Sequence, residues 1–421
     1  MITLTSLIIT ATFVTFLYYL FKGKSRPGKY PPGPKGIPIL GSLLSISFKP
    51  HIRFGEWVKL YGNIFSVKVA SYDFIIISDH KIAKEANNNP ALLGKPDFAL
   101  FNIFAKGNYG IFASHGQVWQ EQRRFMLRNL RDFGFGKSTM RDLAVQEVND
   151  YVSWLKSQES QSISLNRKFT LATINSLWMI MTGKRFSQND PQITDFLDST
   201  NRVFQDVLKS PIILFFPKLA QAFPKLFGWN KVQELVVKNL AFIEKPVNEH
   251  RKEYSPENTP RDFIDSYLSE VNKTTDPNSS FYKASGDHSL VVVLSDLFGA
   301  GSETTSSTLA WAIMYLTKCP ETQKKLHQEL DQVVGKSRQP TLDDRKDLPY
   351  TEAFILETLL GKRQCVGEQI ARDSIFLFLT AIVQRFEITF DPEKPEPTME
   401  SSTQMFLQSD PYYVIMKDRN V

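Results

Sequence analysis

The chain has 421 residues, of which 42% are hydrophobic and 12% aromatic, and this composition predicts a globular protein and excludes a disordered one. Its 50 basic and 44 acidic residues are spread along the chain, so no basic cluster of the kind that binds nucleic acid is present. The two cysteines, Cys319 and Cys365, exclude a disulfide framework beyond one bridge and suit a reducing compartment.

Residues 2–21 carry no charge, and a helix of this length, at about 1.5 Å per residue, crosses the ~30 Å hydrocarbon layer of a bilayer. A cleaved signal peptide is the alternative, but no basic residue precedes the apolar run and no small-residue cleavage site follows it. Four basic residues follow instead within residues 22–29, and they favour a cytosolic position for the rest of the chain. We therefore expect an N-terminal transmembrane helix, with residues 1–29 as membrane anchor and basic stop.

A proline-rich stretch follows the anchor at residues 30–41 and begins Tyr-Pro-Pro-Gly-Pro-Lys-Gly-Ile-Pro. Proline restricts φ and lacks the backbone N–H, so this stretch is expected to form a stiff, extended hinge. An ordinary proline-rich linker is the simpler interpretation of the segment taken alone. No internal repeat and no long polar linker divides residues 42–421, which are expected to form a single, mainly α-helical domain with a small β-sheet.

In chain order, residues 63–78 predict a β-hairpin around a Ser-Tyr-Asp turn. Helical periodicity dominates after it and predicts helices at residues 117–130, 138–155, 171–181, 190–208, 231–252, 262–271, 288–318, 320–334, 350–359 and 369–385. Residues 211–229 are strongly apolar, interrupted by prolines and flanked by lysines, so they form either part of the core or an exposed patch.

Three motifs contain residues suited to chemistry. Trp119 and Arg123 lie one helical turn apart, so an indole N–H and a guanidinium share one face and suit an anion, although an ordinary amphipathic helix explains the pair equally well. Ala-Gly-Ser-Glu-Thr-Thr at residues 300–305 places Glu303 and Thr304 in an otherwise apolar helix, where a solvent-facing polar stripe is the alternative.

The third motif is Gly-Lys-Arg-Gln-Cys-Val-Gly at residues 361–367, directly before a predicted helix. Gly361 and Gly367 leave space around the cysteine, Arg363 supplies positive charge, and the positive end of the helix favours an ionised sulfur at Cys365. A buried, chemically inert thiol is the usual interpretation of a single cysteine. The full pattern of glycine, arginine and cysteine before a helix favours a metal ligand instead.

These motifs together closely resemble those of the cytochrome P450 monooxygenases, and the likeness to the family-2 type of animal microsomal enzymes covers nearly the whole chain. The resemblance implies the cytochrome P450 fold and a haem with Cys365 as its iron ligand. It also implies that Trp119 and Arg123 bind the haem propionates and that Glu303 and Thr304 deliver protons for dioxygen cleavage. The cysteine loop, with Gly361, Arg363 and Gly367, would complete the haem site.

The resemblance further implies an endoplasmic reticulum membrane protein whose catalytic domain faces the cytosol. Electrons would come from NADPH through a membrane-bound flavoprotein reductase, received on a basic surface at Arg124, Arg128 and Arg131. One oxygen atom would enter a lipophilic small molecule bound near residues 97–104, which include Phe98, Phe101 and Phe104, and the apolar stretch at residues 211–229 would dip into the bilayer.

One segment of the family pattern is missing. Residues 347–359 resemble the family's Glu-x-x-Arg helix, with Glu357 as the acid, but Leu360 stands where the arginine belongs. Cys365 follows eight positions after Glu357, whereas several tens of residues with further β-strands separate the two motifs in the family. The domain is therefore expected to have a deletion near residue 360 and a hairpin that has lost sheet partners. The alternative to an active monooxygenase is a catalytically impaired truncated isoform, or a gene-model artefact, that keeps the anchor and the partner surface.

Overall fold

The computed structural model describes residues 29–46, 50–92, 94–96, 98–133, 138–165, 168–187, 190–358, 367–398 and 409–419. The chain forms two compact units. Unit 1 consists of the residues up to Leu100 together with Gln205–Lys231, and unit 2 consists of Phe101–Phe204 together with Val232–Val421.

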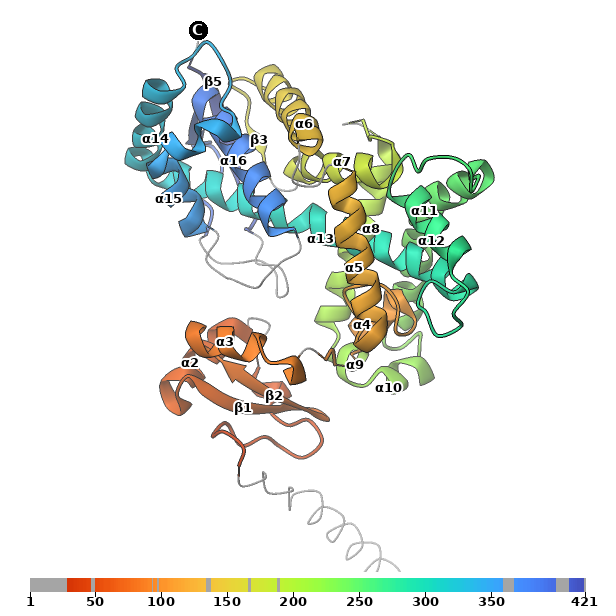
Figure 1. The fold of residues 1–421 in the computed structure, drawn as a ribbon. Coiled ribbons are helices and arrows are strands. Elements are labelled where there is room, and N and C mark those ends of the chain that lie inside the picture. The colour runs from red at the N-terminus through yellow and green to blue at the C-terminus, as the bar shows by residue number, and fades with distance from the viewer. Residues whose placement is uncertain are drawn as a thin grey trace, which may run out of the picture. The chain divides into compact units, whose positions relative to one another are not determined.

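Unit 1 is built on a β-hairpin, drawn in red and orange in Figure 1. Strand β1 (Ile64–Val69) pairs antiparallel with β2 (Tyr72–Ile77), and Ala70 in the turn adopts a positive φ of 52°. Because side chains alternate along a strand, one face of the hairpin is apolar and packs on Trp57 of helix α2 (Pro50–Tyr61).

Further short elements complete unit 1. Helix α3 (His80–Asn87) follows the hairpin and is capped by Asp79, whose carboxylate accepts the N–H of Lys81 at 2.9 Å and that of Ile82 at 3.0 Å. The remaining elements that lie wholly in unit 1 are η1 (Leu43–Ser45), η2 (Pro90–Leu92), α9 (Pro211–Phe215) and α10 (Pro217–Ala222).

Unit 2 is mainly helical, and its longest helix, α13 (Lys283–Lys318), runs the length of the unit with α14–α16 near one end and α5, α11 and α12 toward the other (Figure 1). The other elements with residues in unit 2 are α4 (Ala99–Ala105), α5 (Gly116–Asp132), α6 (Ser138–Ser157), β3 (Ile163–Ser164), α7 (Lys168–Thr182), α8 (Pro191–Lys209), α11 (Trp229–Glu253), α12 (Phe263–Lys273), α14 (Pro320–Val333), η3 (Leu342–Asp347), α15 (Pro349–Thr358), α16 (Glu368–Arg385), β4 (Phe386–Phe390) and β5 (Tyr413–Asp418).

The core of unit 2 lies between α13 and the two apolar helices α7 and α16. Both are buried over most of their length, which is why neither shows a simple amphipathic pattern. Beside them β5 pairs with both β4 and β3. The side-chain amide of Gln323 from α14 donates to the carbonyl of Ile388 at 3.0 Å and accepts the N–H of Ile388 at 2.8 Å. These two bonds satisfy the backbone groups of Ile388 in β4 in place of a neighbouring strand.

The predicted hairpin and helices are confirmed, with ends shifted by a few residues. The sequence prediction missed α2, α3 and α4, which are short, and the sheet formed by β3, β4 and β5. That sheet joins segments more than 200 residues apart, so no local pattern could reveal the pairing of Ile163 with Val414. Within the described residues, the hairpin of unit 1 forms a two-stranded sheet.

The predicted fold class is wrong in its transmembrane helix. Across the described ranges, no helix is both long enough and apolar enough to cross a membrane. The very apolar α7 has 15 residues, about 22 Å of helix against the ~30 Å required, and the longer α13 is interrupted by Asp287, Asp296 and Glu303. Residues 2–21, on which the prediction rested, lie outside the described residues.

A buried ion pair joins the end of α11 to the start of α12. His250 places Nδ1 2.7 Å from the carbonyl oxygen of Pro246 and Nε2 2.7 Å from Asp262 Oδ2. Both partners only accept, so the geometry favours an imidazole protonated on both nitrogens. Burial alone would lower the pKa of His250, but the hydrogen bond and charge of Asp262 outweigh it and hold the pKa above its usual value.

The first prediction concerns this pair. Because the folded-state pKa of His250 is raised, its contribution to stability is complete below its ordinary value of about 6.5 and is lost as the pH rises through the raised value. His250→Ala is expected to lower the free energy of unfolding by about 3 kcal/mol in mildly acidic solution and by less in alkaline solution. Thermal unfolding over this pH range checks it, with the exposed His51→Ala as control. An equal loss for His250→Ala at every pH would contradict a charged pair.

Candidate functional site

Helix α5 brings Trp119 and Arg123 together as the sequence predicts. The guanidinium carbon of Arg123 lies 5.6 Å from the centre of the Trp119 ring, and both side chains are half-buried at the flank of the helix face that packs inward. Within the described chain Arg123 has no carboxylate partner, whereas the half-buried Arg185 is paired with two acids. The pair therefore offers an N–H donor and a free positive charge to an anion.

The orientation of α5 is fixed by polar contacts on its buried side. Gln122 donates to Ser280 Oγ at 2.9 Å and accepts the hydroxyl of Tyr267 at 2.7 Å. Glu121 accepts both the N–H and the hydroxyl of Ser280, at 2.8 and 2.7 Å. These bonds join α5 to α12 and to the turn before α13, so the position of Trp119 is set by the helices behind it.

The opposite side of α5 is basic and exposed. Arg124, Arg128 and Arg131 are all exposed there, and the guanidinium of Arg128 lies 5.8 Å from the Phe125 ring. Because an α-helix has 3.6 residues per turn, these two groups of side chains lie on different faces of α5. One flank presents Trp119 and Arg123, and the other forms a positively charged surface.

In α13, Gly301 has a packing role. A Cβ atom built on it would lie 2.9 Å from Leu177 Cδ2 and 3.3 Å from Ile174 Cδ1, so a larger residue here would require the ends of these two side chains on α7 to shift. Hydroxyl contacts support the approach, because the side-chain oxygens of Thr170 and Ser306 lie 3.0 Å apart and both residues are buried. The motif at residues 300–305 therefore also lies at a packing contact between α7 and α13.

Next to Gly301 the helix turns a polar side outward. Thr304 is exposed, and its hydroxyl donates to the carbonyl of Ala300 at 2.8 Å, as expected for a threonine that bonds back to the preceding turn. Thr308 repeats this bond to the carbonyl of Thr304 at 3.0 Å, and Glu303 is half-buried. Among the described residues, this side of α13 is therefore polar and partly exposed.

The cysteine loop lies outside the described residues, which include neither Cys365 nor Gly361 and Arg363. Gly367 is described and forms the N-cap of α16, where it has no side chain to cap the helix. The helix therefore begins three residues after Cys365, with its positive end toward the preceding segment. This agrees with the helix start expected behind the cysteine.

Asp296 is a residue that the sequence analysis missed. It is carried by α13 two turns before Thr304, and its Oδ2 accepts the N–H of Ile111 at 2.7 Å and of Phe112 at 2.9 Å. Burial raises the pKa of Asp296 to about 6 against the lowering effect of the two N–H donors. A single acid within the apolar run Leu290–Phe298 was the available sign of this contact.

The loop that hydrogen-bonds to Asp296 brings its backbone at Gly110 close to that side chain. Gly110 has a φ of 75°, and a Cβ atom on it would meet Asp296 Oδ2 at 2.5 Å. One further bond from α13 holds the same loop, between His288 Nε2 and the carbonyl of Ala105 at 3.0 Å. Helix α13 thus fixes the segment that leads into α5.

The aromatic residues expected at a substrate pocket do not form one described cluster. Phe98 belongs to unit 1, where it packs with Tyr72 at a ring distance of 4.6 Å. Phe104 belongs to unit 2 and lies 5.8 Å from Phe204. The side chain of Phe101 and residue Asp97 lie outside the described part of the chain.

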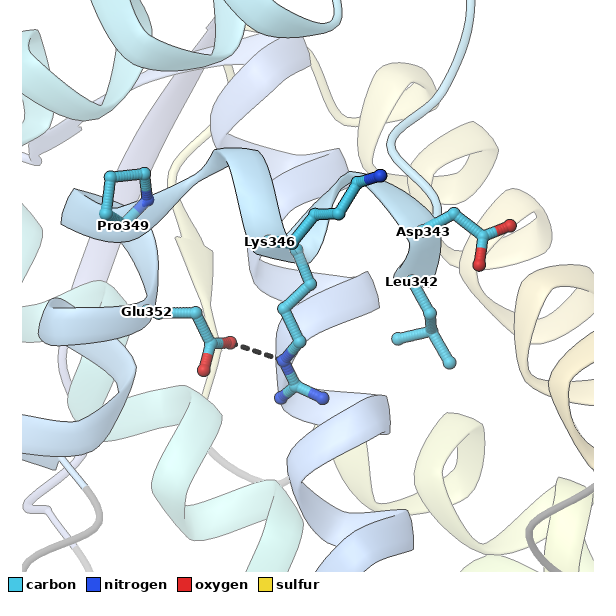
Figure 2. Close-up of a pocket in the computed structure, with 6 residues that line it drawn as sticks. Leu342, Asp343, Lys346, Pro349 and Glu352 are labelled. Carbon is cyan, nitrogen blue, oxygen red and sulfur yellow. Dashed lines mark hydrogen bonds and ion pairs between the residues drawn. The ribbon is translucent and has the colours of Figure 1, made fainter.

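Two other candidate sites are explained by ion pairs. An open cavity of about 720 Å³ is lined by residues of η3 and α15, among them Glu352 (Figure 2). The Oε1 atom of Glu352 lies 2.5 Å from Nε of Arg345, which lines the same cavity. Asp373 pairs with the same guanidinium at 2.7 Å, so the charge is already neutralised. The described residues place His250, Asp262 and Asp265 together, but Arg261 pairs with Asp265 and opposes a metal cation there.

The described residues of unit 2 suit a haem group. Trp119 and Arg123 offer an N–H donor and a positive charge to an anion, α13 presents the hydroxyl of Thr304, and α16 begins three residues after Cys365 in the chain. Haem-thiolate sites need this combination of anion binding, space and hydrogen-bond donors near the sulfur. The haem expected from the sequence therefore agrees with the part of the site that is described.

Comparison with known proteins gives the same result. The family model described as Cytochrome P450 matches residues 31–359 and 360–416. Similar proteins include farnesoate epoxidase of Bombyx mori, 25% identical with 98% of each chain covered. Cytochrome P450 2J2 of Homo sapiens is 30% identical with 89% of this chain and 88% of the relative covered. Probable cytochrome P450 303a1 of Drosophila melanogaster is 32% identical, with 82% and 71% covered.

The same comparisons bear on the missing segment. The alignment with farnesoate epoxidase runs over 492 positions and the chain has 421 residues, so at least 71 positions have no residue of this chain opposite them. The family match is interrupted between residues 359 and 360, directly after the helix that contains Glu357. The first finding shows that the chain is shorter than its alignment with this relative, and the second interrupts the family match at residue 360, where the sequence analysis expects a deletion.

The second prediction concerns Asp296. Asp296→Ala removes the shared acceptor of two backbone N–H groups, so the amides of Ile111 and Phe112 are expected to exchange hydrogen roughly tenfold faster. Asp296→Asn keeps an acceptor oxygen and should retain most of the protection. Because the folded-state pKa is raised, ionisation costs stability as the pH rises from 3.8 to about 6, and neither variant should show this loss. Hydrogen exchange followed by mass spectrometry provides the measurement, and unchanged exchange in Asp296→Ala would contradict the contact.

Proposed function

Because the chain belongs to the cytochrome P450 family of haem-thiolate monooxygenases, we propose that it inserts one oxygen atom of dioxygen into a lipophilic small molecule. The observation that supports this most directly is the polar side of α13, where Thr304 is exposed close to Gly301 in a helix of which half the residues are buried. One relative is named for the epoxidation of farnesoate, which is an oxygen insertion.

In this proposal Cys365 is the iron ligand, and Gly361, Arg363 and Gly367 shape the loop around it. Trp119 and Arg123 bind the propionates, since their N–H groups share one flank of α5 and Arg123 keeps its charge available. The haem, when bound, supplies the activation of dioxygen and the transfer of oxygen to the substrate. The protein supplies the thiolate, the charge that retains the cofactor, and the walls that exclude water.

Proton delivery falls to Glu303 and Thr304. A general acid must lie within hydrogen-bond reach of its acceptor. The exposed Thr304 and its half-buried neighbour in the chain, Glu303, would together pass a proton from solvent inward. The bond from Thr304 to the carbonyl of Ala300 fixes the hydroxyl, leaving its oxygen lone pairs free to accept. Asp296 keeps the neighbouring loop in place and is a positioning residue.

The partners follow from two surfaces. Arg124, Arg128 and Arg131 form an exposed basic surface on α5 that suits an acidic electron donor, here a flavoprotein reductase oxidising NADPH. In unit 1, Leu219, Phe223 and Leu226 are exposed between lysines, which supports contact with a lipid surface. We place the protein at the endoplasmic reticulum membrane, on the cytosolic face.

A second candidate function is favoured by the interrupted family match. If the interval of eight positions from Glu357 to Cys365 replaces a segment of several tens of residues, the cysteine is tethered closely to the end of α15. A chain of this kind keeps the basic surface on α5 and competes for the reductase without turning over substrate. Haem content separates the two candidates.

The third prediction is spectroscopic. The reduced, purified protein is expected to give the carbon monoxide difference band of thiolate-ligated haem, and Cys365→Ala should abolish it because the sulfur ligand is lost. Cys319→Ser removes the other thiol and should leave the band unchanged. Absence of the band in the unmodified chain would favour the second candidate, and a band that persists in Cys365→Ala would mean that another residue is the ligand.

The fourth prediction concerns Thr304. Replacing it by alanine removes the hydroxyl that is proposed to pass protons, so more of the NADPH consumed should appear as hydrogen peroxide and product formation should fall by roughly tenfold or more. Thr304→Ser retains the hydroxyl and should restore the ratio of product to NADPH. Peroxide and product are measured in a reconstituted system with reductase. Equal coupling in the alanine and serine variants would remove Thr304 from the mechanism.

A further inference from the structure

Among the described residues of unit 1, the outer edge of β2 has no partner strand. The other edge of the hairpin is covered, because Ser66 donates its N–H to Pro32 at 2.8 Å, and Lys68 accepts from Ser42 at 2.6 Å. These bonds show that Ser66 and Lys68 turn their backbone groups away from β2. Their partners in the register, Ile75 and Asp73, therefore turn theirs away from β1.

Three residues of β2 share this outward direction, since backbone orientation alternates along the strand. In the described part of unit 1, the outward N–H and C=O groups of Asp73, Ile75 and Ile77 have no hydrogen-bond partner. Natural edge strands are usually protected by lysine, proline or a bulge. Strand β2 reads Tyr-Asp-Phe-Ile-Ile-Ile and contains none of these.

The side chains of the strand are equally suited to pairing. Phe74 and Ile76 face the apolar layer around Trp57, while Ile75 lies on the other face with 46% of its surface exposed. The single charge, Asp73, lies opposite Lys68 in the register and so leaves the edge nearly neutral. A strand with these properties gains backbone hydrogen bonds and apolar burial when another strand joins it.

We propose that this edge pairs with β2 of a second copy of the chain, antiparallel and with Ile75 on the two-fold axis. In this register Ile75 faces Ile75 of the copy, and Asp73 faces Ile77, so no like charges meet. On the opposite face Phe74 of each copy meets Ile76, which continues the apolar layer from one hairpin to the other. The two hairpins form one four-stranded sheet with the self-complementary contact of a closed dimer.

The register provides a sharp crosslinking test. Residues that face each other in a hydrogen-bonded antiparallel pair have Cα atoms about 5.5 Å apart, which suits a disulfide. In the full-length chain carrying Cys319→Ser, the added change Ile75→Cys is expected to give a covalent dimer under mild oxidation. Asp73→Cys is the matched control, because the two introduced thiols then lie about four residues apart along the strand, or roughly 13 Å. Equal crosslinking of both variants, or none at Ile75→Cys, overturns the register.

Solution mass provides the second test, on the full chain in detergent with the detergent contribution subtracted. The unmodified chain and Ile75→Val are expected to be dimeric. Ile75→Lys places two lysines opposite each other and should raise the dissociation constant roughly tenfold or more. This side chain faces away from the core, so the variant should fold normally. A monomer at every concentration overturns the proposal, as does a dimer that Ile75→Lys leaves intact or an oligomer that grows without closing.

Discussion

The packing of α7 on α13 is the contact around which unit 2 is built. A Cβ atom at Gly301 would displace the end of the Leu177 side chain on α7, and the hydroxyls of Thr170 and Ser306 meet in the same helix–helix contact. With α7 pressed against one side of α13, the opposite side is left to present Thr304. One turn of α13 therefore contains both the packing contact at Gly301 and the exposed hydroxyl of Thr304.

Three further hydrogen bonds connect α13, the loop before α5, and α5 itself with its neighbours. Asp296 and His288 on α13 hold the loop that precedes α5, and Gln122 and Tyr267 hold α5 itself. The donors at the flank of α5 are thus placed by buried polar bonds at several independent points. Such bonds are costly to leave unsatisfied, which makes them effective in fixing one arrangement among many of similar packing.

The deletion expected near residue 360 would affect the two units differently. Unit 2 has one large core, in which buried residues of α13 and α16 pack with those of β4 and β5. The core around the hairpin of unit 1 is much smaller, a cluster of four buried residues that includes Trp57, and among the described residues the hairpin has no third strand. Removing a segment of the chain can leave a strand without its hydrogen-bond partner, because the backbone hydrogen bonds of a sheet join different strands, whereas those of a helix lie within one segment.

The sequence by itself determined the helices, the hairpin, the family motifs and the pairing of Trp119 with Arg123. These features depend on local periodicity and on spacing within one or two turns, which a single chain displays directly. It also indicated the missing segment, because two motifs stood eight positions apart. The fold class predicted from it was wrong in one element, a transmembrane helix that the described residues do not contain.

Only the tertiary structure decided the contacts between distant segments. Asp296 meets Ile111 across 185 positions, and β3 joins β5 across about 250. The packing role of Gly301 likewise depends on α7, more than 120 positions earlier. Such contacts are set by which buried polar and apolar surfaces fit together, and no pattern within a local stretch of sequence records that fit.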